Sequence, residues 1–322
     1  MDTRVGWFIA AALGLALISV AMTLSQQFRN EIREAYERLE NQQDVIAQTT
    51  CGPIQYATSG EGQPVLVIHG IMGGVDQGLI LGDGHLPAGY RSIVPSRFGY
   101  LDSPLPEDAT PAGQADAFAC LLDSLGVWHV AAMGTSAGAT SAIEFALRYP
   151  ERCSCLILIS PNAPGEVDIA PPPRPVASVM YNSDFSFWLM TRYFRSAMTS
   201  MMGVPKGFDM TPEYAVAVDE VIATVLPVKP RAAGALFDLF VSNPAVNEIS
   251  LEDLAIPVLV IGAVDDPLAL FRNTKALAER IPDAEFLTIE DGGHMMLGHD
   301  AEVRGAIEEF LSGHYPTGAA TE

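Results

Sequence analysis

Ser136 stands in the pattern Gly-x-Ser-x-Gly, which is typical of a nucleophile held on a sharp turn between a strand and a helix. The apolar run 128–133 before it predicts a buried strand, and residues 139–149 predict a helix that Pro150 ends. Small neighbours leave room for the strained backbone, and the turn directs N–H groups toward a developing oxyanion. We therefore expect Ser136 to act as a nucleophile, the alternative being an ordinary glycine-rich turn.

A candidate acid and a candidate base follow later in the chain, each directly after an apolar strand. The run 256–262 precedes Asp265 and Asp266, and the run 284–289 precedes His294. Ligands of open α/β sheets bind beyond the carboxyl ends of the strands, so we expect these groups to meet the serine there. The chain order Ser…Asp…His differs from the orders in chymotrypsin and subtilisin.

Another glycine-rich segment follows an earlier apolar strand at residues 64–68. It runs from His69 to Gly74, and a loop of this kind can supply a backbone N–H to an oxyanion hole. We expect that N–H from Ile71 and a second one from Ala137. The alternative is a tight turn, and His69 is expected to make structural hydrogen bonds rather than to act as a base.

Because of these residues and their order, the chain resembles the α/β-hydrolase superfamily over residues 51–313. The resemblance implies an α/β fold with a mostly parallel central sheet flanked by helices, and hydrolysis through a Ser-His-Asp triad. A serine at the elbow argues against the dehalogenase and epoxide-hydrolase branches, which use aspartate there. The fold hosts many activities, so it does not select a substrate. The matching segments are His69-Gly70, Arg97-Phe98-Gly99-Tyr100, Gly134–Gly138, Gly262-Ala263-Val264-Asp265 and Gly293-His294.

The resemblance also assigns the roles. Asp265 lies three residues after Gly262, the spacing of the family's acid, and Asp266 is the alternative. His294 takes the proton of the serine and later passes it to the leaving group, while the carboxylate orients the imidazole. His299, at the start of a predicted final helix, is the alternative base. The histidines at 85, 129 and 314 are expected at the surface or in turns.

Residues 162–250 form an unusually long connection between the strand 156–160 and the next core strand. The segment opens with a proline-rich stretch at 171–175 that excludes helix or central strand, and it then becomes helical and apolar. In the resembled family a lid is inserted at this point, so we expect a helical lid. Its methionines and aromatic residues either bind an apolar group of the substrate or form the lid's own core. The predicted substrate-binding residues are Met72, Thr135, Trp188 and Met295.

Residues 5–24 are uncharged and almost wholly apolar, and a stretch of this length can cross a bilayer. We expect a single-pass anchor in residues 1–24, because the start is barely basic and Ser19-Val20-Ala21 is a weak cleavage site. A cleaved signal peptide and a buried helix are the alternatives. Residues 25–50 are expected to be a polar helical stalk and residues 314–322 a tail. The distribution of basic residues slightly favours a cytoplasmic stalk by the positive-inside rule. We nevertheless favour export of the catalytic domain, because a hydrolase on a short N-terminal anchor is commonly built that way.

The net charge is −21, from 39 acidic and 18 basic residues, which argues against nucleic-acid partners and highly anionic substrates. A substrate with one carboxylate would need a local arginine, for which Arg97, Arg192 and Arg195 are candidates. The four cysteines predict no disulfide framework, and Cys120 is expected in the core. Neither a metal nor a cofactor is predicted.

The sequence therefore predicts a membrane-anchored carboxylesterase for small to medium apolar esters. A monoacylglycerol lipase, a thioesterase, a carbon–carbon bond hydrolase and a perhydrolase are alternatives on the same residues. The alternative from another class of function is a ligand-binding protein that keeps the fold but does not turn over a substrate. The loss of a triad residue would have favoured this alternative.

Overall fold

The structure, a computed structural model, describes residues 3–168 and 170–317. Within these residues, its centre is an eight-stranded sheet with the strand order β1-β2-β4-β3-β5-β6-β7-β8. β2 is antiparallel to both of its neighbours, and the strands from β4 to β8 are parallel. The strands are β1 (Val45–Thr49), β2 (Gly52–Gly60), β3 (Gln63–Ile68), β4 (Tyr90–Pro95), β5 (Val130–Thr135), β6 (Cys153–Ile159), β7 (Val258–Ala263) and β8 (Glu285–Ile289).

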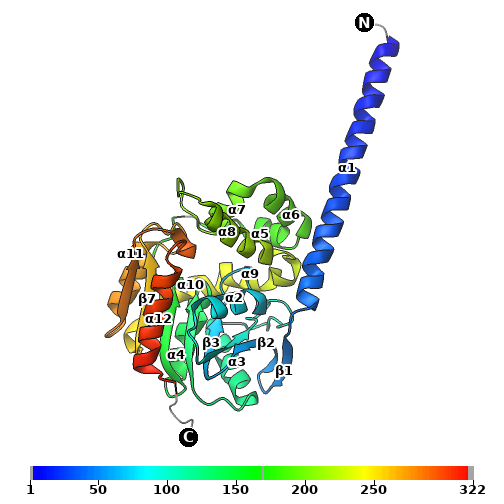
Figure 1. Cartoon of the computed structure of the whole chain (residues 1–322). Coiled ribbons are helices and arrows are strands. Elements are labelled where there is room, and N and C mark those ends of the chain that lie inside the picture. The colour runs from blue at the N-terminus through cyan, green and yellow to red at the C-terminus, as the bar shows by residue number, and fades with distance from the viewer. Residues whose placement is uncertain (1–2, 169, 318–322) are drawn as a thin grey trace.

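Helices cover both faces of this sheet (Figure 1). Those of the core are α2 (Val75–His85), α3 (Pro111–Ser124), α4 (Gly138–Arg148), α11 (Phe271–Arg280) and α12 (Asp300–His314). The remaining helices are α1 (Thr3–Glu40), α5 (Arg174–Tyr181), α6 (Asp184–Tyr193), α7 (Arg195–Met201), α8 (Pro212–Val225), α9 (Ala232–Phe237) and α10 (Asn243–Ala245). Short helical turns are η1 (Lys229–Arg231), η2 (Asp238–Ser242), η3 (Val246–Glu248), η4 (Leu251–Asp253) and η5 (Gly293–Met295).

The apolar strands explain the two layers, because alternate side chains of a strand point to opposite faces. Leu66 and Ile68 of β3 pack with α3, α4 and α11, whereas Val65 and Val67 pack with α12. Strands that are apolar on both faces belong between two helix layers. The predicted strands are therefore present, with boundaries that differ by a few residues. β5 begins at Val130, so Trp128 and His129 lie outside it and are exposed.

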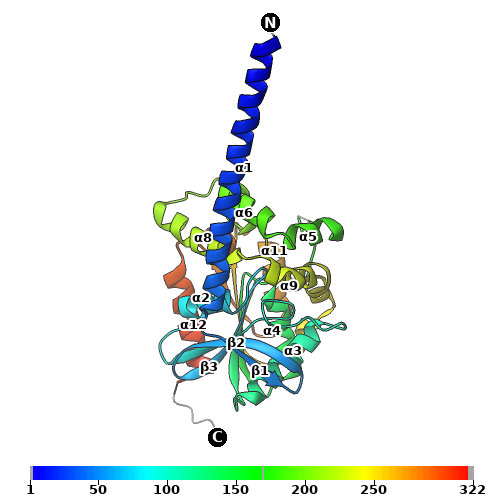
Figure 2. The same cartoon turned by 90° about the vertical axis from the view of Figure 1, so that its right-hand side faces the viewer.

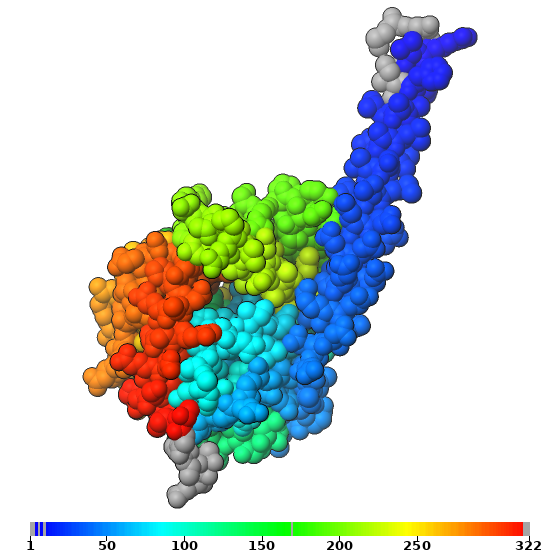
Figure 3. Space-filling view, in the orientation of Figure 1, coloured from blue at the N-terminus to red at the C-terminus, as the bar shows by residue number. Residues whose placement is uncertain are grey.

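Helices α5 to α8, residues 174–225, form a separate helical layer that we call the insertion (Figure 3). The expected insertion reached residue 250, but the chain rejoins the core earlier, since Val246 and Ile249 pack in the core beside α3 and α4. Arg174 and Pro175 were expected to lie outside a helix and instead open α5. A proline is tolerated in a first helical turn, where its missing N–H has no intrahelical acceptor.

The N-terminal segment is one helix of 38 residues, α1, whose first part projects away from all other elements (Figure 2). It is the one helix of the described residues that is long and apolar enough to cross a membrane, and an 18-residue stretch within Ala11–Glu40 has a mean hydropathy of 1.4. The stalk prediction is wrong at its end, because α1 stops at Glu40 and residues 45–49 form β1. β1 pairs with β2, so the sheet begins before Cys51.

Cys51 and Cys120 form a disulfide that ties the turn between β1 and β2 to α3. The sequence did not predict this pair, and Cys120 is only half-buried rather than in the core. The two residues are 69 positions apart in the chain, and their Cα atoms come within 6.0 Å only through the packing of α3 against β1. Cys153 and Cys155 are buried free thiols of β6.

Candidate active site

Ser136 occupies the sharp turn between β5, which ends at Thr135, and α4, which begins at Gly138. Its φ of 52° lies in the left-handed region, which a residue with a side chain adopts only under constraint. Two backbone bonds impose this conformation: the Ser136 N–H donates to Ile159 O at 3.0 Å, and Asn162 N–H donates to Ser136 O at 2.9 Å. The elbow therefore lifts the serine out of the sheet.

The glycine that follows the elbow is required by close packing. A Cβ on Gly138 would lie 2.5 Å from His69 O and 2.6 Å from Ile68 O. Such contacts exclude any side chain, so Gly138 lets the elbow lie directly against the end of β3.

His294 pairs with Asp266 rather than with Asp265. The Nδ1 of His294 lies 2.8 Å from Oδ2 of Asp266, whose side chain is fully buried. The other oxygen of Asp266 accepts the N–H groups of Leu268 and Ala269 at 2.8 and 2.9 Å. These bonds fix the carboxylate, so that its other oxygen can accept a proton from Nδ1 of His294, and Nε2 is left without a hydrogen bond to Asp266.

The prediction of Asp265 as the partner of His294 is therefore wrong. Asp265 is half-buried, and its Oδ1 accepts the N–H of Gly293 at 2.9 Å. The physical reason lies in the turn after β7, a strand that runs through Ala263 instead of ending at Gly262. In that turn, Asp265 is bonded to Gly293, whereas Asp266 is held by the N–H groups of Leu268 and Ala269 and is the aspartate that contacts the imidazole.

The histidine loop lies beside the elbow and beneath the insertion. Ser160 Oγ donates to His294 O at 3.0 Å, and the neighbouring Ile159 O accepts the N–H of Ser136. From the insertion side, Gly203 O accepts the N–H of His294 at 3.0 Å. A Cβ on Gly203 would lie 2.2 Å from the Cβ of His294. Three segments distant in the chain thus position the imidazole, and neither Ser160 nor Gly203 carries a sequence pattern that would have indicated it.

The loop from His69 to Gly74 lies against the same serine. A Cβ on Gly70 would approach Ser136 Cβ to 3.3 Å, so the loop and the elbow are in contact. No hydrogen bond within the loops and turns of the described residues uses the N–H of Ile71 or Ala137. These are the two N–H groups that the sequence predicts for an oxyanion hole.

His69 makes structural hydrogen bonds, as expected. It is fully buried; its Nδ1 lies 2.8 Å from Gly70 O, and its Nε2 accepts the N–H of Arg97 at 3.0 Å. Burial and the nearby Arg97 charge hold the pKa of His69 well below its usual value. A neutral imidazole protonated on Nδ1 satisfies both bonds and supports the loop.

The three candidate arginines for a substrate carboxylate all have acidic partners. Arg97 is buried and forms a two-pronged ion pair with Asp238, with N–O distances of 2.6 and 2.5 Å. Arg192 pairs with Glu31 at 3.9 Å on the surface of the insertion, and Arg195 pairs with Asp219. None of the three is poised for a carboxylate at Ser136.

The buried Asp238 also accepts the hydroxyl of Tyr100. Burial and this carboxylate raise the pKa of Tyr100 well above its usual value, so the phenol stays protonated. Arg97, Tyr100 and Asp238 therefore form one structural network under the loop.

The four predicted substrate-binding residues have different surroundings. Met72 is 4% exposed with a φ of 60°, and Met295 is half-buried in the same apolar cluster. Thr135 lies at the elbow, and its buried hydroxyl has no hydrogen-bond partner among the described residues. Trp188 was placed at the substrate wrongly: it is fully buried, and its Nε1 donates to Glu31 of α1 at 2.7 Å.

His299, the alternative base, lies away from both aspartates of the β7 turn. Its Nε2 is 2.7 Å from Asp291 and its Nδ1 is 3.0 Å from Glu302. These carboxylates raise the pKa of His299, which favours a charged surface residue. Within residues 3–168 and 170–317, no three His, Cys, Asp or Glu side chains are grouped to hold a metal ion.

The family model of the alpha/beta hydrolase fold matches residues 63–199, and a second model, TAP-like protein, matches residues 240–321. A poly(3-hydroxyalkanoate) depolymerase of Ectopseudomonas oleovorans is 31% identical over 202 residues, which cover 62% of this chain and 66% of the relative. A 2-hydroxy-6-oxo-6-phenylhexa-2,4-dienoate hydrolase of Comamonas testosteroni is 34% identical over 37% of this chain and 44% of its own.

Among solved structures, an alpha/beta hydrolase fold protein from Nakamurella multipartita superposes with a TM-score of 0.67. It is 23% identical, and the match covers 84% of this chain and 99% of that one, which shows a shared fold. The sheet order, the family models and these relatives together strongly support membership of the α/β-hydrolase superfamily and indicate a hydrolase.

Proposed function

We propose that this chain hydrolyses carboxylic esters with Ser136 as nucleophile, His294 as base and Asp266 as the acid that orients it. The observation that carries the proposal is the pair of the buried Asp266 and the partly exposed His294, with an Nδ1–Oδ2 distance of 2.8 Å, at the end of the sheet where the strained serine lies. A carboxylate held by two amides, an imidazole and an elbow serine form the set that acyl transfer needs.

In this mechanism Ser136 Oγ attacks the acyl carbon and passes its proton to Nε2 of His294. The negative charge that develops on the carbonyl oxygen is stabilised by the N–H groups of Ile71 and Ala137. Asp266 keeps the imidazole in the required tautomer and stabilises the imidazolium. His294 then protonates the departing alcohol, and a water molecule that it activates releases the acid.

The arginines support a neutral substrate over an anionic one. Arg97, Arg192 and Arg195 are paired with acidic residues, and the chain carries a net charge of −21. Burying a substrate carboxylate without a cationic partner is costly. Met72 of the loop 69–74 and Met295, which follows His294, share an apolar cluster with the insertion and favour an apolar acyl or alcohol group of small to medium size.

The test is hydrolysis of p-nitrophenyl esters from acetate to palmitate by the full chain in detergent, with Ser136→Ala as the control. We expect nitrophenol release that Ser136→Ala abolishes, and the optimum chain length reports the size of the substrate pocket. If the wild type releases no nitrophenol and is not labelled by a fluorophosphonate, the proposal is wrong.

A carbon–carbon bond hydrolase is the second candidate, because the Comamonas testosteroni relative bears that kind of name and the same residues could serve. Its named dienoate carries a carboxylate, so the paired arginines disfavour it. With 2-hydroxy-6-oxo-6-phenylhexa-2,4-dienoate as substrate, hydrolysis would be measured as the loss of the dienoate chromophore. A kcat/KM above that for every ester would replace the ester proposal with this one.

We further propose that α1 anchors the chain in a membrane and that the catalytic domain is exported. The apolar first part of α1 supports the anchor, and the Cys51–Cys120 disulfide supports export because disulfides persist in oxidising compartments. Protease protection of tags at the two ends of the chain tests both points. Degradation of a C-terminal tag in intact cells is the expected result.

A further inference from the structure

The oxyanion loop, residues 69–74, is held at both ends by buried arginines. Arg97 donates to Gly70 O at 3.1 Å, and Arg231 donates to Gly73 O. Both guanidinium groups are almost fully buried, with exposures of 1% and 0%. Ile71 lies between the two fixed carbonyls, so the direction of its N–H depends on them.

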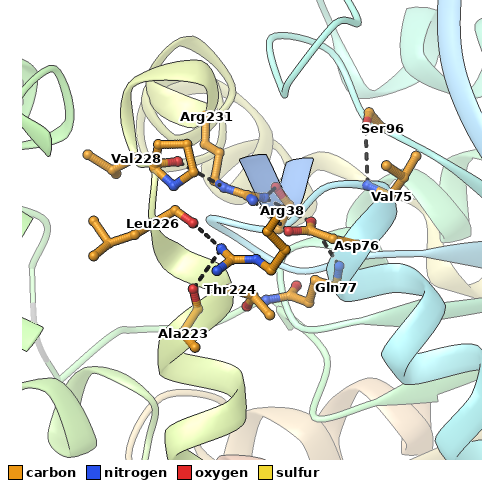
Figure 4. A network of polar contacts seen from close by, with 12 residues as sticks. Arg38, Val75, Asp76, Gln77, Ser96, Ala223, Thr224, Leu226, Val228 and Arg231 are labelled. Carbon is orange, nitrogen blue, oxygen red and sulfur yellow. Dashed lines mark hydrogen bonds and ion pairs between the residues drawn. The ribbon is translucent and has the colours of Figure 1, made fainter. Parts of the chain in front are cut away.

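Arg231 does not belong to the core sheet but to η1, at the end of the turn 226–231 that follows the insertion. Asp76, in the first turn of α2, fixes its guanidinium with N–O distances of 2.6 and 3.1 Å (Figure 4). Arg231 Nε also donates to Pro227 O at 3.2 Å, within the same turn. The position of the turn 226–231 therefore sets the position of Gly73.

The turn 226–231 is itself held by α1. Tyr36 donates its hydroxyl to Asp184 at 3.1 Å, and the other oxygen of Asp184 accepts the N–H groups of Val228 and Lys229, each at 2.9 Å. These bonds connect a side chain of α1 to the backbone of the turn through one carboxylate.

Arg38 of α1 makes a second connection to the same turn. Its guanidinium donates to Ala223 O at 2.8 Å and to Leu226 O, which are carbonyls at the end of α8 (Figure 4). A cation at a helix C-terminus also interacts favourably with the helix dipole. Arg38 thus holds the start of the turn, and Tyr36 holds its middle through Asp184.

An apolar seam keeps α1 against the insertion. Ala35 is 4% exposed, and the ring of Phe28 packs edge-on against Phe185 and Trp188 at centroid distances of 5.2 and 5.5 Å. Figure 1 shows this half of α1 running beside α6. The helix that carries the candidate anchor is therefore packed on the domain and is not a loose tether.

We infer that Arg231 is a positioning residue of the oxyanion hole and that α1 completes the active site by holding it. Tyr36 reaches the turn 226–231 through Asp184, Arg38 reaches it directly, and Arg231 connects the turn to Gly73. This inference rests on the proposed function, since it concerns the hole beside Ser136. It assigns to the second half of α1 a part in catalysis in addition to any part in anchoring.

The experiment uses the full chain in detergent with Tyr36→Phe, Arg231→Gln and Arg231→Lys. The matched control is Tyr193→Phe, because the Tyr193 hydroxyl bonds to Gln27 of α1 at 3.2 Å on the same seam but does not contact the turn. Each variant is assayed for kcat and KM on the best ester and for inhibition by phenylboronic acid, whose tetrahedral adduct places an oxygen in the hole.

We expect Tyr36→Phe to lower kcat by about tenfold and Arg231→Gln by about a hundredfold, because misplacing a catalytic group by ~1 Å costs about that much. Boronate affinity should fall by the same factors while KM stays within twofold, and Arg231→Lys should be intermediate. Tyr193→Phe should match the wild type.

Unchanged kcat and boronate affinity in Tyr36→Phe would overturn the role of α1, and unchanged values in Arg231→Lys and Arg231→Gln would overturn that of Arg231. A fall in kcat that leaves boronate affinity intact would also overturn the inference, because it would mean a general structural defect. Failure of the proposed function is distinct, since the wild type itself would then neither hydrolyse esters nor bind the boronate.

Discussion

Asp265 and Asp266 are adjacent in the chain but have different surroundings. Asp266 is buried and shares its carboxylate between His294 and two backbone amides. Asp265 is half-buried and accepts a single bond from Gly293. Asp266 can therefore orient the imidazole, whereas Asp265 supports the backbone of the loop that carries it.

Asp266→Asn should lower kcat by about 10³- to 10⁴-fold, because an amide at this position favours the wrong imidazole tautomer. Asp265→Asn removes one charged hydrogen bond from the loop and should lower kcat by about tenfold or less. Steady-state hydrolysis of the best ester measures both. A larger loss for Asp265→Asn would reverse the assignment of the acid.

The sequence limited the acid to these two residues but could not choose between them. The choice depends on which carboxylate the turn after β7 directs at His294, and the two aspartates are adjacent and identical in type. A strand boundary is fixed by pairing with its neighbours, here β6 and β8, rather than by the local pattern.

The buried His69 should make stability depend on pH. Its pKa is lowered by burial in the folded protein, so below about pH 6.5 the unfolded chain binds a proton that the folded chain does not. Stability is therefore lost as the pH falls through that value, by up to about 1.4 kcal/mol per pH unit.

His69→Gln should remove this component while keeping an acceptor for the N–H of Arg97. The measurement is the free energy of urea unfolding at pH 5.5 and pH 7.0 for both proteins. The wild type should lose more stability on acidification than the variant. Equal losses would mean that His69 is protonated in the folded state.

At the scale of elements, the loop after α7 determines how the insertion meets the histidine loop. Gly203 and Gly207 in this loop both have left-handed φ values, 77° and 83°. They differ in their surroundings, because a Cβ on Gly203 would lie 2.2 Å from His294 Cβ, whereas one on Gly207 would have no atom within 4 Å.

Gly203→Ala should therefore lower kcat by about a hundredfold, since it displaces the imidazole from Asp266 by about an ångström. Gly207→Ala introduces similar backbone strain in open space and should cost about 1 kcal/mol of stability with little change in kcat. Thermal unfolding and ester hydrolysis of both variants separate the two effects. Equal kcat values in the two variants would contradict a tight contact at Gly203.

Elements with local signatures could be predicted, and contacts between distant elements could not. The parallel strands and the Ser136 elbow follow from apolar runs, glycines and helix signals that are contiguous in the chain. The prediction for Trp188 was wrong because its partner Glu31 is 157 residues away in the chain. An apolar residue of an insertion has the same local sequence pattern whether it faces the substrate or another helix. β1 was missed because five residues of an edge strand resemble the end of a polar helix.

At the scale of the whole molecule, the N-terminal segment is joined to the core by β1 and by a disulfide. Five residues of β1 pair with β2, and Cys51 at the following turn is linked to Cys120 of α3. Helix α1 is thus connected to the sheet by a short segment that is held at both β1 and the disulfide.

The disulfide predicts the number of reactive thiols. Denatured but unreduced protein should take up two equivalents of an alkylating agent, at Cys153 and Cys155, and four after reduction. Intact-mass spectrometry gives the count directly. Four reactive thiols without reduction would argue against the disulfide and against export.

The docking of α1 also determines how closely the domain could approach a bilayer. The contacts of α1 with the insertion extend up to Gln27 and the packing up to Leu24, which is where the apolar stretch ends. In an anchored molecule there is consequently almost no free spacer between the lipid and the insertion. The enzyme would be held at a set height and tilt, so its encounter rate with apolar substrates would follow their partitioning into the bilayer and lateral diffusion, not their concentration in water.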